Sequence, residues 1–407
     1  MSAQRAQGAR GRRRWEAPTV LPVSLANAEV LEEARLRAMG QHGELSEVDL
    51  ASAVRATGRV IGSASSTEML RSLSDDIHGL GILERLAEVP GTTDILIDPR
   101  GRVWVDGSSG LHASDTAFSD PGQIRALAVR LAAAGGRRLD DAQPFVDVSL
   151  GNYRIHAVLP PISTGGPLLS IRIQGSKNQP LDALVADPDW LAALKAIVAA
   201  KLNFLISGGT GAGKTTLLAA LLASVPANQR IVVVEDSAEL TPAHPHLVGL
   251  QSRSGNVEGA GEISLEVLVR QALRMRPDRL VVGECRGAEV REFLAAMNTG
   301  HEGAAGTVHA NSVMAVPARL AAMGALAGMD SAATALQAAS ALDVLVHLRR
   351  DPATGRRSPI QLGRLVLTTH GTLAVQLIHA QASDPADPEA LTWFRDRLDA
   401  AGEWSPW

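Results

Sequence analysis

The segment that most constrains the fold of this chain is the stretch 208–215, which reads Gly-Gly-Thr-Gly-Ala-Gly-Lys-Thr. It matches the spacing Gly-x4-Gly-Lys-Ser/Thr in full, and it lies between a short apolar run at 203–206 and a helical run that reaches Leu222. Glycines let the backbone curl so that successive N–H groups point inward at phosphate oxygens, and the following helix adds its positive end. A Gly-rich turn without chemistry is the alternative, but the Lys-Thr pair and the strand–helix context argue against it. We therefore predict a phosphate-binding loop.

Two side chains of this loop have distinct expected roles. Lys214 places a compact positive charge near the β- and γ-phosphates, and Thr215 offers its hydroxyl to a magnesium ion. ATP and Mg²⁺ are therefore the expected cofactors. The residues expected to bind the nucleotide from this segment are Gly208, Gly209, Thr210, Gly211, Ala212, Gly213, Lys214, Thr215 and Thr216.

Carboxylates follow two further apolar runs. The first run, 231–234, ends at Glu235, and Glu239 lies four residues beyond it. In a parallel sheet such strand ends border the ligand crevice, so Glu235 is expected to orient or activate water, with Glu239 in support. The alternative is a helix N-terminus that carries acids because the helix dipole favours them.

The second run, 280–282, is followed by Gly283 and Glu284. Many phosphate-loop proteins place an acid here to hold magnesium-bound water, and we expect Glu284 to do so, with Gly283 making room for its longer side chain. An ordinary solvent-facing acid is the alternative. Cys285 is the chain's only cysteine, so no intramolecular disulfide can form. We expect it to be buried and not to act as a nucleophile.

Residues 299–311 contain His301 and His309 among glycines and polar residues, and they are expected to form a loop. The spacing of the two histidines is not a metal-binding signature by itself. A solvated loop histidine is the simple interpretation of His309. The sharper hypothesis is a sensor that contacts the γ-phosphate and responds to its loss.

The order of these signals predicts an α/β protein with several parts. Strand and helix patterns alternate in a mixed region before a polar Gly/Ser/Lys/Asn segment, and short apolar strands typical of a buried parallel sheet follow it. The expected organisation is a disordered basic tail (1–26), a helical segment (27–74), an α+β domain (75–173), a linker (174–180), a doubly wound nucleotide-binding domain (181–385), and a C-terminal helix and tail (386–407).

Composition narrows the classes of partner. The net charge is -4 and the sequence pI is about 6.3, which argues against nucleic acid as a general partner. No apolar run approaches the roughly 20 residues that span a bilayer, so any membrane association should come through a partner or a surface. The arginine-rich tail is either simply solvated or a basic arm that touches acidic lipid or another protein.

Taken together, four segments resemble the secretion (traffic) ATPase superfamily of type II and type IV secretion systems. They are LISGGTGAGKTTLLAAL, VVVEDSAEL, ALRMRPDRLVVGECRG and MNTGHEGAAGTVHANS, and the branch they resemble most is that of tight-adherence (Flp) pilus assembly, including actinobacterial conjugal-transfer-associated relatives. Upstream, GRRLDDAQPFVD and VLPPISTGGPLLSIRI resemble the N-terminal domain of that superfamily, so the likeness covers roughly residues 75–380.

The resemblance implies a RecA-like ATPase domain joined by a flexible linker to a smaller sensing domain, in a hexameric ring with ATP between the domains. It assigns Glu235 and Glu239 to an aspartate box, Glu284 to an atypical Walker B position and His309 to a histidine box. It also implies that Arg154 and Arg172 face nucleotide, a task that suits the planar guanidinium; solvent-facing strand arginines are the alternative. It implies a cytoplasmic protein, peripheral to the inner face of the cell membrane, that moves an inner-membrane platform protein.

The sequence departs from the superfamily pattern in places. Ile97-Asp98-Pro99 stands where Val-Asn-Gly is common, and the turn before the second basic strand is shortened to Gly151-Asn152-Tyr153-Arg154. Ala304-Ala305-Gly306 replaces small polar residues in the histidine box. These differences concern details of the N-terminal domain and leave the hydrolytic set intact.

Three rival functions have distinct signatures. A DNA-translocating RecA-like motor predicts DNA-stimulated ATPase activity, a small-molecule kinase needs an acceptor pocket and a lid, and a scaffold would bind nucleotide without turnover. The set formed by Glu235, Glu284 and His309 favours a hydrolytic motor over the last two. Ring size, the direction of the motor and the cargo do not follow from the sequence.

Overall fold

The computed structural model describes residues 79–403, except 108–109, 174–178, 254–260, 352–353 and 382–384. The chain divides into two compact units, residues 1–88 and 89–407. In the described part of the first unit, the 3-10 turn η1 (Gly81–Leu83) runs into the short helix α4 (Glu84–Ala87). The expected tail (1–26), the helical segment (27–74) and most of the expected linker lie outside the described residues.

The first sheet has six strands in the order β3-β2-β1-β6-β5-β4, and all its pairings are antiparallel. One helix, α5 (Pro121–Ala134), packs on β4, β5 and β6 and begins at Asp120, whose side chain accepts from the N–H of Gly122. Strand β3 has the polar sequence HASDTA and no buried residue, so it lacks the apolar alternation from which strands are predicted. The strands are β1 (Thr92–Ile97), β2 (Arg102–Gly107), β3 (His112–Ala117), β4 (Phe145–Leu150), β5 (Tyr153–Val158) and β6 (Leu168–Ile173).

The second sheet has eight strands in the order β14-β13-β12-β7-β11-β10-β8-β9. The six strands from β12 to β9 pair in parallel, and β13 and β14 extend the sheet in antiparallel fashion. They are β7 (Phe204–Gly208), β8 (Ile231–Glu235), β9 (Leu247–Gln251), β10 (Arg279–Val282), β11 (Ala305–Val308), β12 (Val344–Arg350), β13 (Arg357–Leu367) and β14 (Leu373–Ala380).

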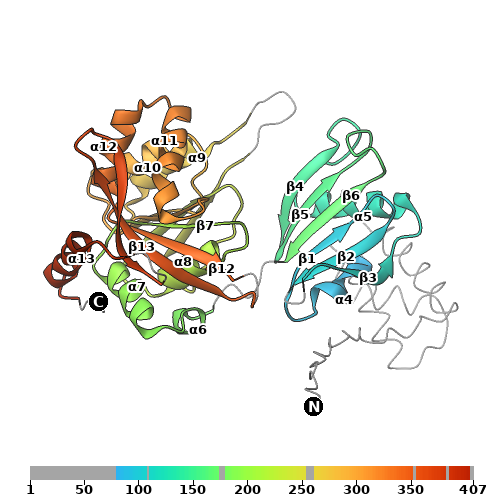
Figure 1. Ribbon diagram of the computed structural model, residues 1–407. Coiled ribbons are helices and arrows are strands. Elements are labelled where there is room, and N and C mark those ends of the chain that lie inside the picture. Colours follow the sequence, from blue (N-terminus) through green and yellow to red (C-terminus); the bar gives the residue numbers. More distant parts are fainter. Residues whose placement is uncertain are drawn as a thin grey trace, which may run out of the picture. The chain divides into compact units, whose positions relative to one another are not determined.

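Helices cover both faces of this sheet, as Figure 1 shows, so successive residues of its strands join opposite cores. Ile206 packs with α7, α8 and α13, whereas Leu205 packs with α9 to α12. The helical elements on the first side are α6 (Leu181–Leu184), α7 (Pro188–Ala199), α8 (Lys214–Ala223) and α13 (Pro388–Ala400). Those on the second are α9 (Leu265–Ala272), η2 (Leu273–Met275), α10 (Glu289–Asn298), η3 (Val313–Ala315), α11 (Val316–Leu326) and α12 (Ser331–Ala341).

One expectation about local structure is wrong. Residues 305–308 were expected to lie within a loop, but they form β11, which is fully buried between β7 and β10. The run Ala-Gly-Thr-Val has no long apolar side chain apart from Val308, so its strand character comes from the two neighbours that pair with it. His309 therefore follows a central strand.

The buried arginine of β10 explains a glycine in the segment before β11. Arg279 is 2% exposed and donates to the carbonyl of Val198 and to Oε1 of Gln229. A Cβ at Gly303 would lie 1.9 Å from Nη1 of Arg279, and the φ of Gly303 is +74°. Only glycine fits there, because both the space and the backbone conformation exclude a side chain.

Within the described ranges, no helix combines the length and apolar character that crossing a bilayer requires.

Candidate nucleotide-binding and hydrolysis site

The predicted phosphate loop lies between a buried strand and a buried helix. β7 ends at Gly208, α8 begins at Lys214, and the turn between them needs glycine because Gly211 and Gly213 have φ values of +71° and +91°. Lys214 is 8% exposed, and its Nζ donates to the carbonyls of Gly208 at 3.0 Å and Gly209 at 3.1 Å. Burial lowers the pKa of Lys214. The loop thus holds a desolvated cation beside the N-terminus of a ten-residue helix.

The parallel register brings three other predicted side chains to the same edge of the sheet. Val234 of β8 pairs with Val282 of β10, Val282 pairs with Gly306 of β11, and Val308 of β11 pairs with Ser207 of β7. Glu235 is the last residue of β8, whereas Glu284 and His309 come just after β10 and β11, so all three share the carboxyl edge with the phosphate loop. This is the edge at which doubly wound sheets bind ligands.

Glu235 is held firmly at the end of β8. It is 7% exposed, and its Oε1 accepts from the backbone N–H groups of Glu239 at 3.2 Å and Leu240 at 3.1 Å. No helix directly follows β8: residues 236–246 form bends, coil and a turn, so a capped helix N-terminus does not explain these acids.

Gly283 makes room for the side chain of Glu235. A Cβ on Gly283 would lie 2.6 Å from Cγ of Glu235. The two strand ends are neighbours in the sheet, so the side chain from β8 occupies the space that the glycine after β10 leaves open.

Glu284 lies between two cationic or polarisable partners. Its Oε1 is 2.6 Å from Nε2 of His309, and its Oε2 accepts from the guanidinium of Arg286. His309 in turn lies 3.5 Å from Nζ of Lys214. Burial, and then the charge of Lys214, lower the pKa of His309, which favours a neutral ring. These contacts join the ends of β10 and β11 to the phosphate loop.

Comparison with known proteins agrees with this arrangement. The family described as type II/IV secretion system protein matches residues 78–379. Putative conjugal transfer proteins of two Mycobacterium tuberculosis strains are 51% identical over 343 residues, which is 82% of this chain and 97% of theirs. This chain belongs to the type II/IV secretion system ATPase family.

A more distant relative and a solved structure agree with this family assignment and with the fold. The type IV secretion system protein PtlH of Bordetella pertussis is 32% identical over 272 residues, covering 60% of this chain and 79% of PtlH. The X-ray structure of the Legionella pneumophila ATPase DotB matches with a TM-score of 0.50 and 20% identity, covering 72% of this chain and 82% of DotB. The latter likeness shows the fold alone, a RecA-like α/β domain preceded by an α+β region.

The donor set of the secretion ATPase fits a magnesium ion carried by phosphates. Oε1 of Glu284 is buried and lies 2.6 Å from Nε2 of His309, so a metal-bound water would reach this oxygen only if the imidazole moved. In the same ranges no group of three or more His, Cys, Asp or Glu side chains is arranged to hold a metal. Mg²⁺ does not need such a cage, because it binds through phosphates, waters and one or two protein oxygens. Thr215, in the first turn of α8, is the protein oxygen expected to bind it.

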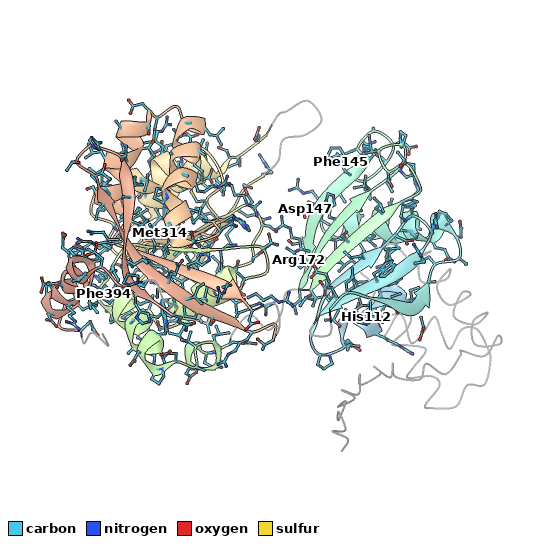
Figure 2. All side chains as sticks on the ribbon, viewed as in Figure 1. His112, Phe145, Asp147, Arg172, Met314 and Phe394 are labelled. Atoms are coloured by element: carbon cyan, nitrogen blue, oxygen red, sulfur yellow. The ribbon has the colours of Figure 1, made fainter. Side chains whose placement is uncertain are left out.

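The two arginines of the antiparallel sheet have different partners. Arg154 of β5 donates to both carboxylate oxygens of Asp147 and, at 2.7 Å, to Oε1 of Glu239. Arg172 of β6 instead pairs with Asp94 across the sheet at 3.0 Å, and among the described residues no hydrogen bond or ion pair links Arg172 to the phosphate loop. Figure 2 labels Asp147 and Arg172 on their strands. Glu239 therefore has two contacts: its N–H supports Glu235 and its carboxylate binds Arg154.

Three residues near the secretion ATPase site were missed by the sequence analysis. Arg286 holds Glu284, and it follows that acid by only two residues, a signal that was available. His347 of β12 is 4% exposed, its Nδ1 lies 3.0 Å from Oγ of Ser207, and burial lowers the pKa of His347 to about 4. Arg357 of β13 donates to the carbonyl of Gly211 at 2.8 Å. No sequence spacing links the last two to the loop, since they lie more than 130 residues away.

Cys285 is 1% exposed, as expected. Burial is the main cause that raises the pKa of its thiol, so the sulfur stays protonated and is a poor nucleophile.

Proposed function

We propose that this chain is an ATP-hydrolysing motor subunit that assembles into a hexameric ring and powers a type II/IV secretion system or Flp (tight-adherence) pilus assembly. The observation that supports this best is the convergence of Glu235, Glu284 and His309 on the edge of the sheet that carries Lys214. A scaffold that only binds nucleotide would not need a water-activating acid beside a second acid. A small-molecule kinase would need an acceptor pocket and a lid, and it would not need the second acid and the histidine that meet here.

In the proposed reaction, the amides of residues 208–215 bind the triphosphate and Lys214 turns from the loop carbonyls to the β- and γ-phosphates. Glu235, fixed by two backbone N–H groups, orients water for in-line attack on the γ-phosphorus. Bound Mg²⁺ would offset charge on the phosphates, with Thr215 as its protein ligand and Glu284 holding one of its waters. The water oxygen bonds to the γ-phosphorus and the bond between the β–γ bridging oxygen and the γ-phosphorus breaks, leaving ADP, phosphate and the proton that the water releases.

His309 and the arginines complete the proposal. His309 contacts both Glu284 and Lys214. Loss of the γ-phosphate would change the charge that faces these two residues, and His309 would respond to that change. Arg154 or Arg172 would contact the nucleotide when the domains close on ATP, and reopening at the linker (174–180) would be the work stroke. The expected place of action is the cytoplasmic face of the inner membrane, on a platform protein.

A RecA-like motor for conjugal DNA transfer is the second candidate. It is favoured by the 51% identical relatives, whose names describe putative conjugal transfer proteins. The two functions differ in their response to DNA: a motor that acts on DNA should hydrolyse ATP faster when DNA is present, whereas a pilus motor should not.

The test of hydrolysis is the Lys214→Ala variant of the full chain. Steady-state phosphate release should fall at least about a hundredfold, because the cation that stabilises the transferred phosphoryl group is lost. Lys195→Ala, which removes an exposed lysine from α7, is the matched control and should keep wild-type turnover. Full activity in Lys214→Ala would refute the assignment.

A further inference from the structure

The phosphate loop is contacted on one side by the hairpin formed by β12 and β13. β12 pairs in parallel with β7, and β13 returns antiparallel to β12, with Arg350 opposite Arg357. This places the end of the hairpin at which β12 ends and β13 begins at the carboxyl edge of β7, next to the loop. The described residues at that end include four exposed arginines, Arg349, Arg350, Arg356 and Arg357.

Both strands of the hairpin contact the phosphate loop. From β12, Nδ1 of His347 lies 3.0 Å from Oγ of Ser207, and a Cβ on Gly208 would lie 2.8 Å from the carbonyl oxygen of Leu348. From the start of β13, Nε of Arg357 donates to the carbonyl of Gly211 at 2.8 Å. The side chain of Arg357 also covers Gly213, since a Cβ there would lie 3.0 Å from Cδ of Arg357.

The phosphate loop needs a contact from outside at residues 209–211, because the glycines there constrain the backbone only weakly. Gly209, Thr210 and Gly211 are exposed, and glycine has more backbone freedom to lose on ordering than any other residue. Lys214 ties the carbonyls of Gly208 and Gly209, but its amine must leave them to reach phosphates. Arg357 uses the carbonyl of Gly211 and takes none of the N–H groups that bind phosphate, so its contact persists when nucleotide binds.

We propose that Arg357 is a positioning residue for the ATPase reaction: it holds the turn of the phosphate loop in the shape that binds the triphosphate. This inference rests on the proposed function. The guanidinium of Arg357 also keeps a positive charge beside the loop. The hydrogen bond from its Nε–H to the carbonyl of Gly211 is what distinguishes Arg357 from the other three exposed arginines of the hairpin. In its absence, nucleotide binding itself has to order the turn, which weakens binding without changing the chemical step.

The experiment compares Arg357→Ala, Arg357→Lys and Arg356→Ala in the full chain. Arg356 is the matched control, because it is adjacent, exposed and basic, and among the described residues its hydrogen bonds involve only its backbone: its N–H donates to Oγ1 of Thr354 and its carbonyl accepts from the N–H of Asp351. Arg357→Ala should raise the KM for ATP about 5- to 20-fold and leave kcat within about twofold, which is the effect expected from one lost hydrogen bond of a charged donor. Arg357→Lys keeps the charge but lacks the Nε–H group, so its KM should rise as well. Arg356→Ala should match wild type.

Binding of a fluorescent ADP analogue separates this inference from the proposed function. The dissociation constant should rise for Arg357→Ala by the same factor as KM. Equal effects of Arg356→Ala and Arg357→Ala would mean that only net charge matters, and a wild-type KM in Arg357→Ala would mean that the contact is idle; either result overturns the inference. If wild type binds the analogue but hydrolyses no ATP, the proposed function fails while the binding comparison still decides the role of Arg357. No binding by wild type would overturn both.

Discussion

The carboxylate of Glu284 is divided between two environments. Oε2 accepts from Arg286, whereas Oε1 is buried and lies 2.6 Å from Nε2 of His309. The arginine contact is a charge-assisted hydrogen bond and anchors one end of the carboxylate. The other end is held only by a histidine that also lies 3.5 Å from Nζ of Lys214, so a change in the charge at the phosphate loop can alter the His309 contact and make Oε1 available to a metal-bound water.

Glu284→Gln tests that role, because glutamine keeps the shape and removes the charge. We expect the dissociation constant for a fluorescent ATP analogue to stay within about threefold of wild type, while kcat falls about a hundredfold through poorer placement of metal and water. Glu389→Gln, on α13 with a side chain that is 77% exposed, is the control for loss of one carboxylate. Wild-type turnover in Glu284→Gln would remove this residue from the site.

At the scale of the element, the order of the parallel strands decides which side chains can meet. β10 lies between β8 and β11, so the end of β10 must make room for the side chain at the end of β8 while presenting its own acid to the end of β11. Gly283 meets the first requirement, because Glu235 fills the space where its side chain would be.

Gly283→Ala should therefore displace Glu235 without unfolding the sheet. A methyl group 2.6 Å from Cγ of Glu235 forces the carboxylate away from the N–H groups of Glu239 and Leu240. A displacement on the order of 1 Å can reduce turnover by about a hundredfold, so we expect kcat to fall about 10- to 100-fold with KM nearly unchanged. Gly249→Ala in the neighbouring strand β9 adds the same methyl where nothing lies within 4 Å, and it should behave as wild type. Unchanged kcat in Gly283→Ala would show that the position of Glu235 is not limiting.

At the scale of the whole molecule, the six-stranded sheet carries the two arginines proposed to contact nucleotide, and the eight-stranded sheet carries the phosphate loop. Arg172 lies opposite Asp94 on the neighbouring strand, and the ion pair between them must open before Arg172 can reach a phosphate. Exposed pairs of this kind contribute only about 0–1 kcal/mol, so a triphosphate competes for the guanidinium easily. A ring whose subunits close on ATP would use such weakly held arginines.

Ring formation is a prediction that light scattering can check. With Mg²⁺ and a slowly hydrolysed ATP analogue, the full chain should give a species of six times the monomer mass, since closure on nucleotide orders the surfaces that meet a neighbouring subunit. The Lys214→Ala variant should assemble less under the same conditions. A wild-type chain that stays monomeric at every nucleotide and protein concentration tested would contradict the ring.

The local patterns of the sequence were enough for the phosphate loop, the acids after β8 and β10, and most strands. These features depend on neighbours in the chain: Gly211 and Gly213 on their own backbone conformation, and the apolar runs on burial of both faces. The α/β class and the α+β region before it followed from the same alternation. Strands β3 and β11, which consist of polar or small residues, were not predicted, because pairing with neighbouring strands forms them. Strands β9, β12, β13 and β14 were not predicted either, although they contain apolar residues.

Only the tertiary structure decided which distant residues share the site. Glu284 and His309 meet because β10 and β11 are adjacent in the sheet, and Gly283 serves Glu235 because β8 is the other neighbour of β10. His347 and Arg357 reach the loop because β12 pairs with β7 and β13 folds back on β12. Strand order is set by which apolar faces bury one another over the whole domain, and no local spacing encodes it.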